Sequence, residues 1–142
     1  MAESIVAGCI IISDKKEILL LRRTSGIYDI PSEKADSVAF KDPKNPDLVA
    51  LQKVALIGVF ENLGNDIRLD QMFFFRNSEW VEDGKKINSY KFITRIISGS
   101  PMLNNPTLYE GISWISSERL SSLRLSPDLD AIKQDLQKIL CK

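Results

Sequence analysis

Two helix signals, one in the middle of the chain and one near its end, constrain the fold most. In the middle, Asn45 can cap a helix, Pro46 suits its first position, and Asp47 complements the helix dipole. Gly64, followed by an asparagine, supplies a stop signal. The sequence therefore predicts a helix over residues 46–63, of which 48–63 packs on a sheet.

The second helix signal begins at Ser126, which can act as a cap before Pro127 at the first helical position. The apolar residues that follow share one helix face: Leu129, Ile132, Leu136, Ile139 and Leu140. This pattern predicts a helix over residues 126–140, packed on the opposite side of the sheet from the first.

The other apolar segments have the alternation and the β-branched residues of strands. We expect strands over residues 4–12, 17–21, 67–75, 89–97 and 111–115, with turns at 13–16 and, within residues 82–86, at Asp83-Gly84. In residues 89–97, Tyr90 and Phe92 alternate with Lys91 and Ile93. Residues 36–46 and 99–106 read as polar loops, and 116–123 as a short helical turn. The predicted fold class is α+β, with a mixed sheet between helices and residues 1–142 in one domain.

Composition excludes several function classes. Lysine plus arginine equals aspartate plus glutamate at 19 each, so we expect neither duplex nucleic acid nor a membrane as partner. Cys9 and Cys141 lie near opposite ends and suggest no metal site or disulfide framework, which favours a cytoplasmic location. Histidine is absent, so acid–base chemistry would fall to carboxylates, lysine, tyrosine or a bound metal.

Residues 26–36, GIYDIPSEKAD, resemble the lead-in of the Nudix (MutT-like) hydrolases, Gly-x-Trp-x-x-Pro-Gly-Gly-Lys-x-Glu. Tyr28 stands for the tryptophan, Ser32 and Glu33 for the two glycines, and Asp36 for the glutamate. The stretch ENLG, residues 61–64, is similar to the end of the Nudix box. The order of the later segments, including Trp114 and the terminal helix, is similar as well. This resemblance implies a Nudix fold over nearly the whole chain.

The resemblance also implies which positions hold metal. Active Nudix helices carry glutamates at the positions of Gly58, Glu61 and Asn62, and together these gather the divalent cations that bridge a diphosphate. Here only Glu61 is a glutamate, and Ile57 stands at the arginine position. Relative to the family's usual spacing, about ten residues are inserted at 37–47. The box is therefore degenerate.

Candidate site residues follow from the same comparison. If the protein is active, the candidate ligands of Mg²⁺ or Mn²⁺ are Glu61, Glu33 and Asn62. The candidate catalytic residues are Glu61 and Glu110. The candidate substrate-binding residues are Tyr28, Arg22 and Arg23. Each also has an ordinary interpretation. Gly58 can serve close packing or mark a lost glutamate, Tyr28 can belong to the core, and the charged residues can be solvated surface.

Three hypotheses for function remain open at this point. The first is a weak or inactive domain that binds a nucleoside-diphosphate derivative. The second is a metal-dependent pyrophosphohydrolase that uses substitute acids such as Glu33, Asp36 or Glu110. The third is a protein-interaction module whose cleft is filled by Ile57 and Phe60. We also expect that the pair of replacements Gly58→Glu and Asn62→Glu would rebuild the carboxylate face.

Overall fold

The computed structural model describes residues 3–35 and 47–140. Expectations for Asp36, Asn45, Pro46 and Cys141 therefore lie outside the described residues. The described elements, in chain order, are β1 (Glu3–Ile11), β2 (Glu17–Arg23), β3 (Tyr28–Asp29), β4 (Ser32–Lys34), α1 (Leu48–Leu63), β5 (Ile67–Leu69), β6 (Phe73–Glu82), β7 (Lys85–Thr94), β8 (Ile96–Gly99), β9 (Tyr109–Ser116), α2 (Ser117–Leu120) and α3 (Pro127–Leu140).

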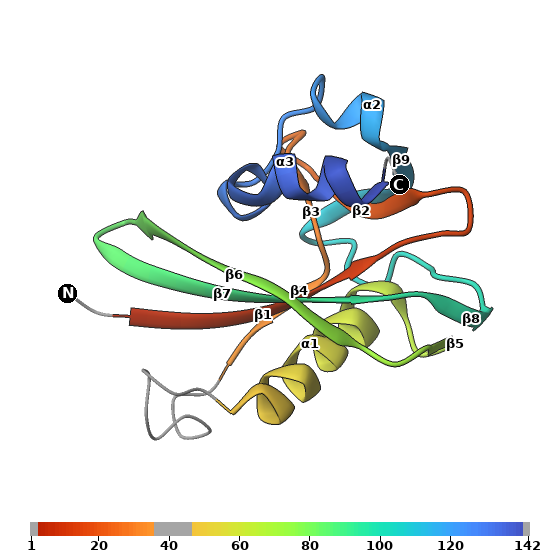
Figure 1. Ribbon diagram of the computed structural model, residues 1–142, viewed down its shortest axis with the longest axis horizontal. Coiled ribbons are helices and arrows are strands. Elements are labelled where there is room, and N and C mark those ends of the chain that lie inside the picture. The colour runs from red at the N-terminus through yellow and green to blue at the C-terminus, as the bar shows by residue number, and fades with distance from the viewer. Residues whose placement is uncertain (1–2, 36–46, 141–142) are drawn as a thin grey trace.

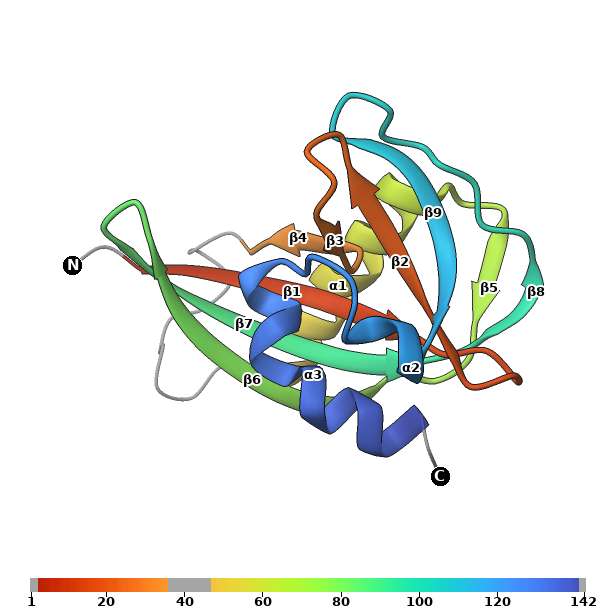
Figure 2. The same ribbon diagram turned by 90° about the horizontal axis from the view of Figure 1, so that it is seen from above.

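The main sheet has the strand order β4-β1-β7-β6 and is mixed. Strands β1 and β7 pair in parallel, while β4 and β6 pair antiparallel to their neighbours. A second sheet, β3-β2-β9, crosses above it, and a two-stranded sheet, β5-β8, lies at one end (Figure 2). The predicted α+β class with a mixed sheet is confirmed, and the structure adds two smaller sheets.

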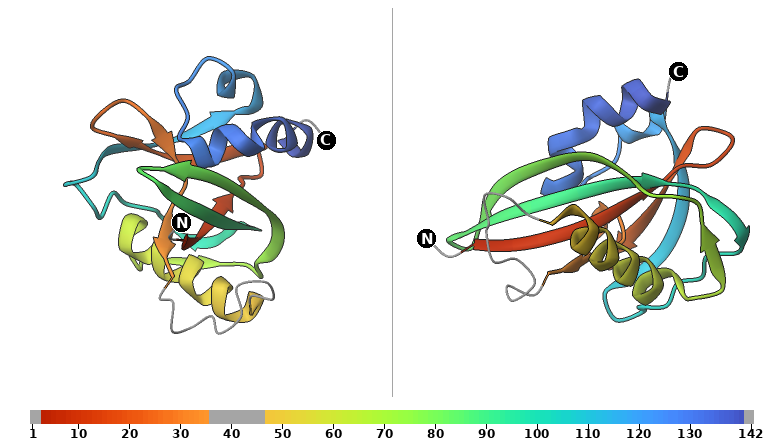
Figure 3. Two further views of the ribbon diagram at one scale, coloured as in Figure 1. Left: turned by 90° about the vertical axis from the view of Figure 1, so that its left-hand side faces the viewer. Right: turned by 60° about the horizontal axis from the view of Figure 1, so that its bottom comes forward.

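Helices α1 and α3 cover opposite faces of the main sheet, as predicted (Figures 1 and 3). On the α1 face, Leu51 and Val59 pack with residues of β1 and β7 in one buried cluster. On the α3 face, Ile132 and Leu136 pack with Ile10 of β1 in a second cluster. In the described part of the chain no helix is long and apolar enough to cross a membrane.

Some element boundaries differ from the predicted ones. Helix α1 begins at Leu48, and its cap is Asp47, whose carboxylate accepts hydrogen bonds from the amides of Val49 (3.0 Å) and Ala50 (3.4 Å). That carboxylate satisfies two amides that have no partner inside the helix. The hairpin at Asp83-Gly84 is confirmed, since β6 and β7 pair up to Glu82↔Lys85.

The predicted strand over 67–75 is wrong as a single element. It is two strands, β5 and β6, because the chain leaves the small sheet after Leu69 and joins the main sheet at Phe73. The break is held by Asp70, whose amide donates to the Arg95 carbonyl (2.9 Å) and whose carbonyl accepts from the Thr94 hydroxyl (2.8 Å). The short strands β3 and β4 were not predicted.

Candidate active site

Gly58 is the point at which α1 touches the backbone of β4. A Cβ atom built on Gly58 would lie 2.7 Å from the carbonyl carbon of Ser32, 2.9 Å from its oxygen and 3.0 Å from the Glu33 nitrogen. These are backbone atoms, so they cannot move aside as a flexible side chain does. Close packing is therefore the interpretation of Gly58 that the structure supports. The contact with β4 counts against the expectation that a glutamate at position 58 would rebuild the carboxylate face.

The same approach of α1 to β4 brings two candidate ligands together. The carboxyl groups of Glu33, on β4, and Glu61, in the last turn of α1, are in contact. This hydrogen bond, together with partial burial and the negative charge of Glu61, raises the pKa of Glu33 above its ordinary value. Across residues 3–35 and 47–140, no three Asp, Glu, His or Cys side chains gather into a group that could hold a metal. Among the described residues, the site thus has two carboxylates in contact, those of Glu33 and Glu61.

Asn62, the third candidate ligand, is buried and fully engaged within the fold. Its side-chain amide donates to the Gly58 carbonyl (2.7 Å), and its amide oxygen accepts from Asn105 (3.3 Å). Its backbone carbonyl accepts from the Asn104 amide (3.0 Å). Asn62 therefore ties the end of α1 to the segment between β8 and β9, and this placement favours a structural role over a metal-ligating one.

An open concavity lies beside Glu61. Its volume is about 430 Å³, and it is lined by Ile57, Phe60, Glu61, Gly64, Asn65 and Asn104. Ile57 is 49% exposed and forms part of the wall. The cleft beside Glu61 is thus open, which counts against the hypothesis that Ile57 and Phe60 fill it.

Arg22, Glu110 and Tyr28 form a separate group on the β3-β2-β9 sheet. The guanidinium of Arg22 pairs with the Glu110 carboxylate and also bonds the Tyr28 side chain, and these contacts raise the pKa of Arg22. Arg22 and Tyr28 are directly opposite each other on β2 and β3. Glu110 is therefore committed to Arg22 and does not join Glu33 and Glu61.

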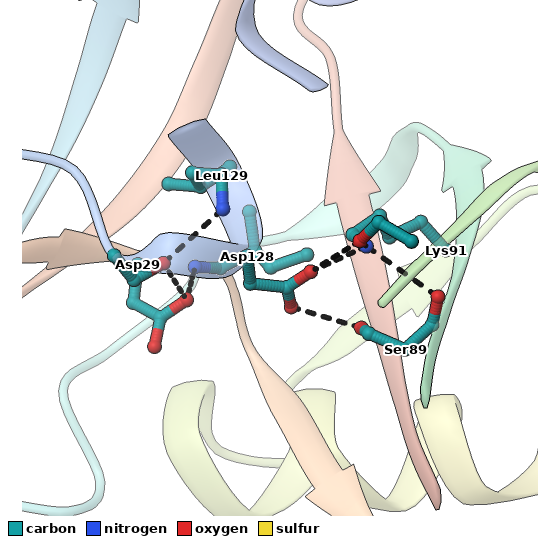
Figure 4. A network of polar contacts seen from close by, with 8 residues as sticks. Asp29, Ser89, Lys91, Asp128 and Leu129 are labelled. Carbon is teal, nitrogen blue, oxygen red and sulfur yellow. Dashed lines mark hydrogen bonds and ion pairs between the residues drawn. The ribbon is translucent and has the colours of Figure 1, made fainter. Parts of the chain in front are cut away.

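Arg23 belongs to a buried network that sequence reasoning did not connect. Its guanidinium pairs with Asp29 at 2.6 Å, and Asp29 also accepts from the Ser126 hydroxyl (3.0 Å) and the Ile30 amide (2.9 Å). Ser126 in turn caps α3, as predicted, by accepting from the Leu129 amide (3.3 Å; Figure 4). Burial raises the pKa of Asp29, and Arg23 opposes that shift.

Lys91 on β7 is fully buried and was missed as a functional candidate. Its ammonium group pairs with the Asp128 carboxylate and donates to the Ser78 hydroxyl, while the Ser89 hydroxyl donates to Asp128 at 2.9 Å (Figure 4). Burial lowers the pKa of Lys91, and Asp128 opposes that shift. The signal available in the sequence was the alternation of 89–97, which places Lys91 on the same strand face as Ile93.

A small pocket of about 180 Å³ opens beside both networks. It is lined by Val6, Arg23, Asp29, Ser32, Trp80, Glu82, Ile87, Ser126, Pro127 and Asp128. Within the described residues, two buried donors in its wall, Arg23 Nε and Trp80 Nε1, have no hydrogen-bond partner. Buried donors without partners are rare in folded proteins.

Edge strand β4 connects this pocket to the two carboxylates. Successive residues of a strand point to opposite faces of the sheet. Ser32 lines the pocket with residues of α3, and Glu33 meets Glu61 of α1 on the other face. A molecule that passes over the edge at β4 could therefore contact the pocket and the carboxylate pair together.

Comparison with known proteins gives the class of fold. No protein-family model matches this sequence, and no curated protein matches it either. Solved structures do match. They include the MutT Nudix hydrolase from Burkholderia pseudomallei, at 18% identity with a TM-score of 0.70 over 97% of this chain and 98% of that one.

The MutT protein from Methanosarcina mazei Go1 is similar at 18% identity, with a TM-score of 0.71 over 99% of this chain and 97% of that one. A Nudix hydrolase from Nitrosomonas europaea is similar at 13% identity, with a TM-score of 0.72 over 96% and 89%. The chain therefore has the Nudix fold, as the sequence resemblance implied.

The contact between Glu33 and Glu61 leads to a prediction on stability. Because its folded-state pKa is raised, Glu33 contributes stability that is fully present below its ordinary pKa of 4.5 and is lost as pH rises through the raised value. Glu33→Gln is expected to abolish this loss of stability at higher pH, and so to raise Tm at neutral pH. Thermal unfolding of both proteins from pH 4.5 to neutral pH tests it. Glu118→Gln, a change at an exposed glutamate of α2, is the control. If the Tm difference between Glu33→Gln and the unmodified chain stayed the same from pH 4.5 to neutral pH, the prediction would be contradicted.

Proposed function

We propose that residues 1–142 form a single cytoplasmic Nudix-fold domain that binds a nucleoside-diphosphate-type ligand and hydrolyses it weakly or not at all. The observation that carries this proposal is the packing of Gly58 on the β4 backbone. Among the described residues, it leaves Glu61 as the carboxylate that lines the cleft, with Glu33 in contact with it. The balanced charge of the chain supports neither duplex nucleic acid nor a membrane as partner.

The two carboxylates fit one metal ion better than several. Mg²⁺ in proteins is commonly held by one or two carboxylates together with substrate phosphates and water. Glu33 and Glu61 would hold one Mg²⁺ or Mn²⁺ in this way, and the ion would neutralise charge on the diphosphate. The cation would also relieve the repulsion between Glu33 and Glu61.

The pocket beside Arg23 and Trp80 suits the uncharged part of such a ligand. Arg23 and Trp80 line it, and Ser32 connects it to Glu33 on the next residue of β4. Arg22 is half exposed but paired with Glu110, so a phosphate would reach it only when that ion pair opens. Tyr28 is held against Arg22 in the same group.

One observation keeps a second function in view, that of a metal-dependent pyrophosphohydrolase. The sequence offered Glu61 as the sole glutamate of the box, whereas the structure adds Glu33 at its side. If hydrolysis occurs, these two carboxylates carry the acidic function of the site. Glu110 is not a substitute in this arrangement, because it pairs with Arg22.

Calorimetric titration with ADP, in the presence and absence of MnCl₂, tests the proposal. We expect Mn²⁺-dependent binding of ADP that weakens by at least about tenfold, or about 1.4 kcal/mol, in Glu61→Gln and in Glu33→Gln. Glu118→Gln should bind like the unmodified chain. Phosphate release should stay near background. Rapid phosphate release that is lost in Glu61→Gln would support the hydrolase instead. If Glu61→Gln and Glu33→Gln bound ADP as tightly as the unmodified chain, the proposed site would be contradicted.

A further inference from the structure

An open groove separates α1 from the chain that leads from β5 into β6. Its volume is about 510 Å³. Leu56 and Phe60 on α1, and Leu69 on β5, are half-buried apolar residues that line it and pack against the core on this face of the main sheet. Ile67 and Met72 line it as well and are buried. We call this concavity the α1–β5 groove.

The wall of the α1–β5 groove that faces α1 is held in place by hydrogen bonds to the backbone. After β5 the chain breaks at Asp70, whose amide donates to the Arg95 carbonyl (2.9 Å) and whose carbonyl accepts from the Thr94 hydroxyl (2.8 Å). A preformed pocket costs a ligand little ordering, and small-molecule sites usually have volumes of about 300–1,000 Å³. The groove therefore has the size and the fixed wall of a ligand site.

Two cations line the α1–β5 groove, one on each side. They are Lys53 of α1 and Arg68 of β5, and both are exposed. Within the described part of the chain, neither charged group has a hydrogen-bond or ion-pair partner. Asp70, the acid among the described residues that line the groove, is engaged, because one carboxylate oxygen accepts from the Gln71 amide (2.8 Å) and the other lies 3.7 Å from Arg95. The groove thus combines apolar walls with positive charge that no described residue neutralises.

We propose that the α1–β5 groove is a ligand site for a small molecule with an apolar body and one anionic head group, such as a free fatty acid. The apolar body covers the walls and removes them from water, and the head group pairs with Lys53 and Arg68. A neutral apolar molecule would leave both cations without a partner, and a purely polar anion would leave the walls exposed to water. Among the described lining residues, the groove shares Phe60 alone with the cleft beside Glu61, so this proposal does not depend on the function proposed above.

Two fluorescent probes with the same ring system test the need for an anion. The anionic probe, 8-anilino-1-naphthalenesulfonate, carries a sulfonate, and the neutral probe, N-phenyl-1-naphthylamine, has the same rings without it. We expect the double variant Lys53→Met and Arg68→Met to bind the anionic probe about tenfold more weakly than the unmodified chain, the combined effect of two exposed ion pairs, and the neutral probe no more weakly. Lys138→Met, at an exposed lysine of α3 on the opposite face of the main sheet, should bind both probes like the unmodified chain. Dodecanoate, below the concentration at which it forms micelles, should displace the anionic probe.

Neighbouring positions on α1 show where the probes bind. Leu56→Gln places an amide in the wall of the groove, and Ile57→Gln makes the same kind of change in the wall of the cleft beside Glu61. We expect Leu56→Gln to weaken the binding of both probes several-fold and Ile57→Gln to leave it unchanged. If Leu56→Gln does not fold, Val49→Gln takes its place, because Val49 also lines the groove and is 62% exposed.

Several results would overturn the proposal. They are binding of neither probe by the unmodified chain, equally tight binding of the anionic probe by the double variant, failure of dodecanoate to displace that probe, and weaker binding in Ile57→Gln but not in Leu56→Gln. Sedimentation of the chain with phosphatidylglycerol vesicles that is lost in Leu56→Gln would assign the groove to a membrane surface, and this would overturn the proposal too.

Discussion

Gly58→Ala is expected to lower the free energy of unfolding by about 1–3 kcal/mol, the usual effect of overpacking. An alanine inside a helix is otherwise about 1 kcal/mol better than a glycine. The added methyl group would lie 2.7 Å from the Ser32 carbonyl carbon, so α1 and β4 would have to separate. Urea unfolding measures the change.

Gly111 of β9 is the matched control, because a Cβ atom built there meets nothing within 4 Å. Gly111→Ala should change stability by less than about 0.5 kcal/mol. If Gly58→Ala were the more stable protein, helix propensity would have outweighed the contact with β4. In that case the packing explanation for Gly58 would be wrong.

The same geometry applies to the pair of replacements Gly58→Glu and Asn62→Glu. A larger side chain at 58 meets the same backbone, and a glutamate at 62 would remove the bonds that Asn62 makes with Gly58 and Asn105. We therefore expect loss of stability and no gain in Mn²⁺ affinity by calorimetry.

Asp128→Asn is expected to lower the free energy of unfolding by about 3–5 kcal/mol, because it leaves the Lys91 ammonium buried without an anion. Lys91→Met should cost less, since Asp128 keeps the Ser89 hydroxyl and the N-terminal turn of α3. The double variant should be more stable than Asp128→Asn alone. Urea unfolding of the four proteins gives the coupling between the two residues.

Asp130→Asn provides the control for this series. Asp130 lies in the same first turn of α3, but it is exposed and its contact with Lys133 is long, at 3.8 Å. Its replacement should cost no more than about 1 kcal/mol. If Asp128→Asn cost no more than this control, Lys91 and Asp128 would not form a buried ion pair in solution.

Local patterns in the sequence predicted those elements whose ends are set by neighbouring residues. Ser126 and Pro127 predicted the start of α3, and Asp83-Gly84 predicted the β6–β7 hairpin, because caps and turns depend on neighbouring residues. Strands β3 and β4 could not be predicted in this way. They are two and three residues long, and they exist as strands only through pairing with β2 and β1.

The candidate site was predictable in part. Glu33 was suggested as a ligand that acts beside Glu61 in place of a lost glutamate, and the structure brings the two together, although their contact depends on how closely α1 approaches β4. The partnership of Lys91 with Asp128 could not be predicted, because it joins a strand to a helix that is distant in the sequence. Likewise, Asn62 looked like a terminal helix residue until its partner Asn105 was known.

The register of β4 against β1 makes this strand sensitive to insertions and deletions. Gly8 stands opposite Ser32 on β1, and a Cβ atom there would lie 3.1 Å from the Ser32 Cβ, so glycines press on this short strand from both β1 and α1. A slip of one residue along β4 would turn Glu33 into the pocket and Ser32 toward Glu61. One inserted or deleted residue between 31 and 34 would therefore remove an acid from the cleft and place a charge among Asp29 and Asp128 at the same time. The three residues of this edge strand thus fix which of Ser32 and Glu33 faces the pocket and which faces Glu61.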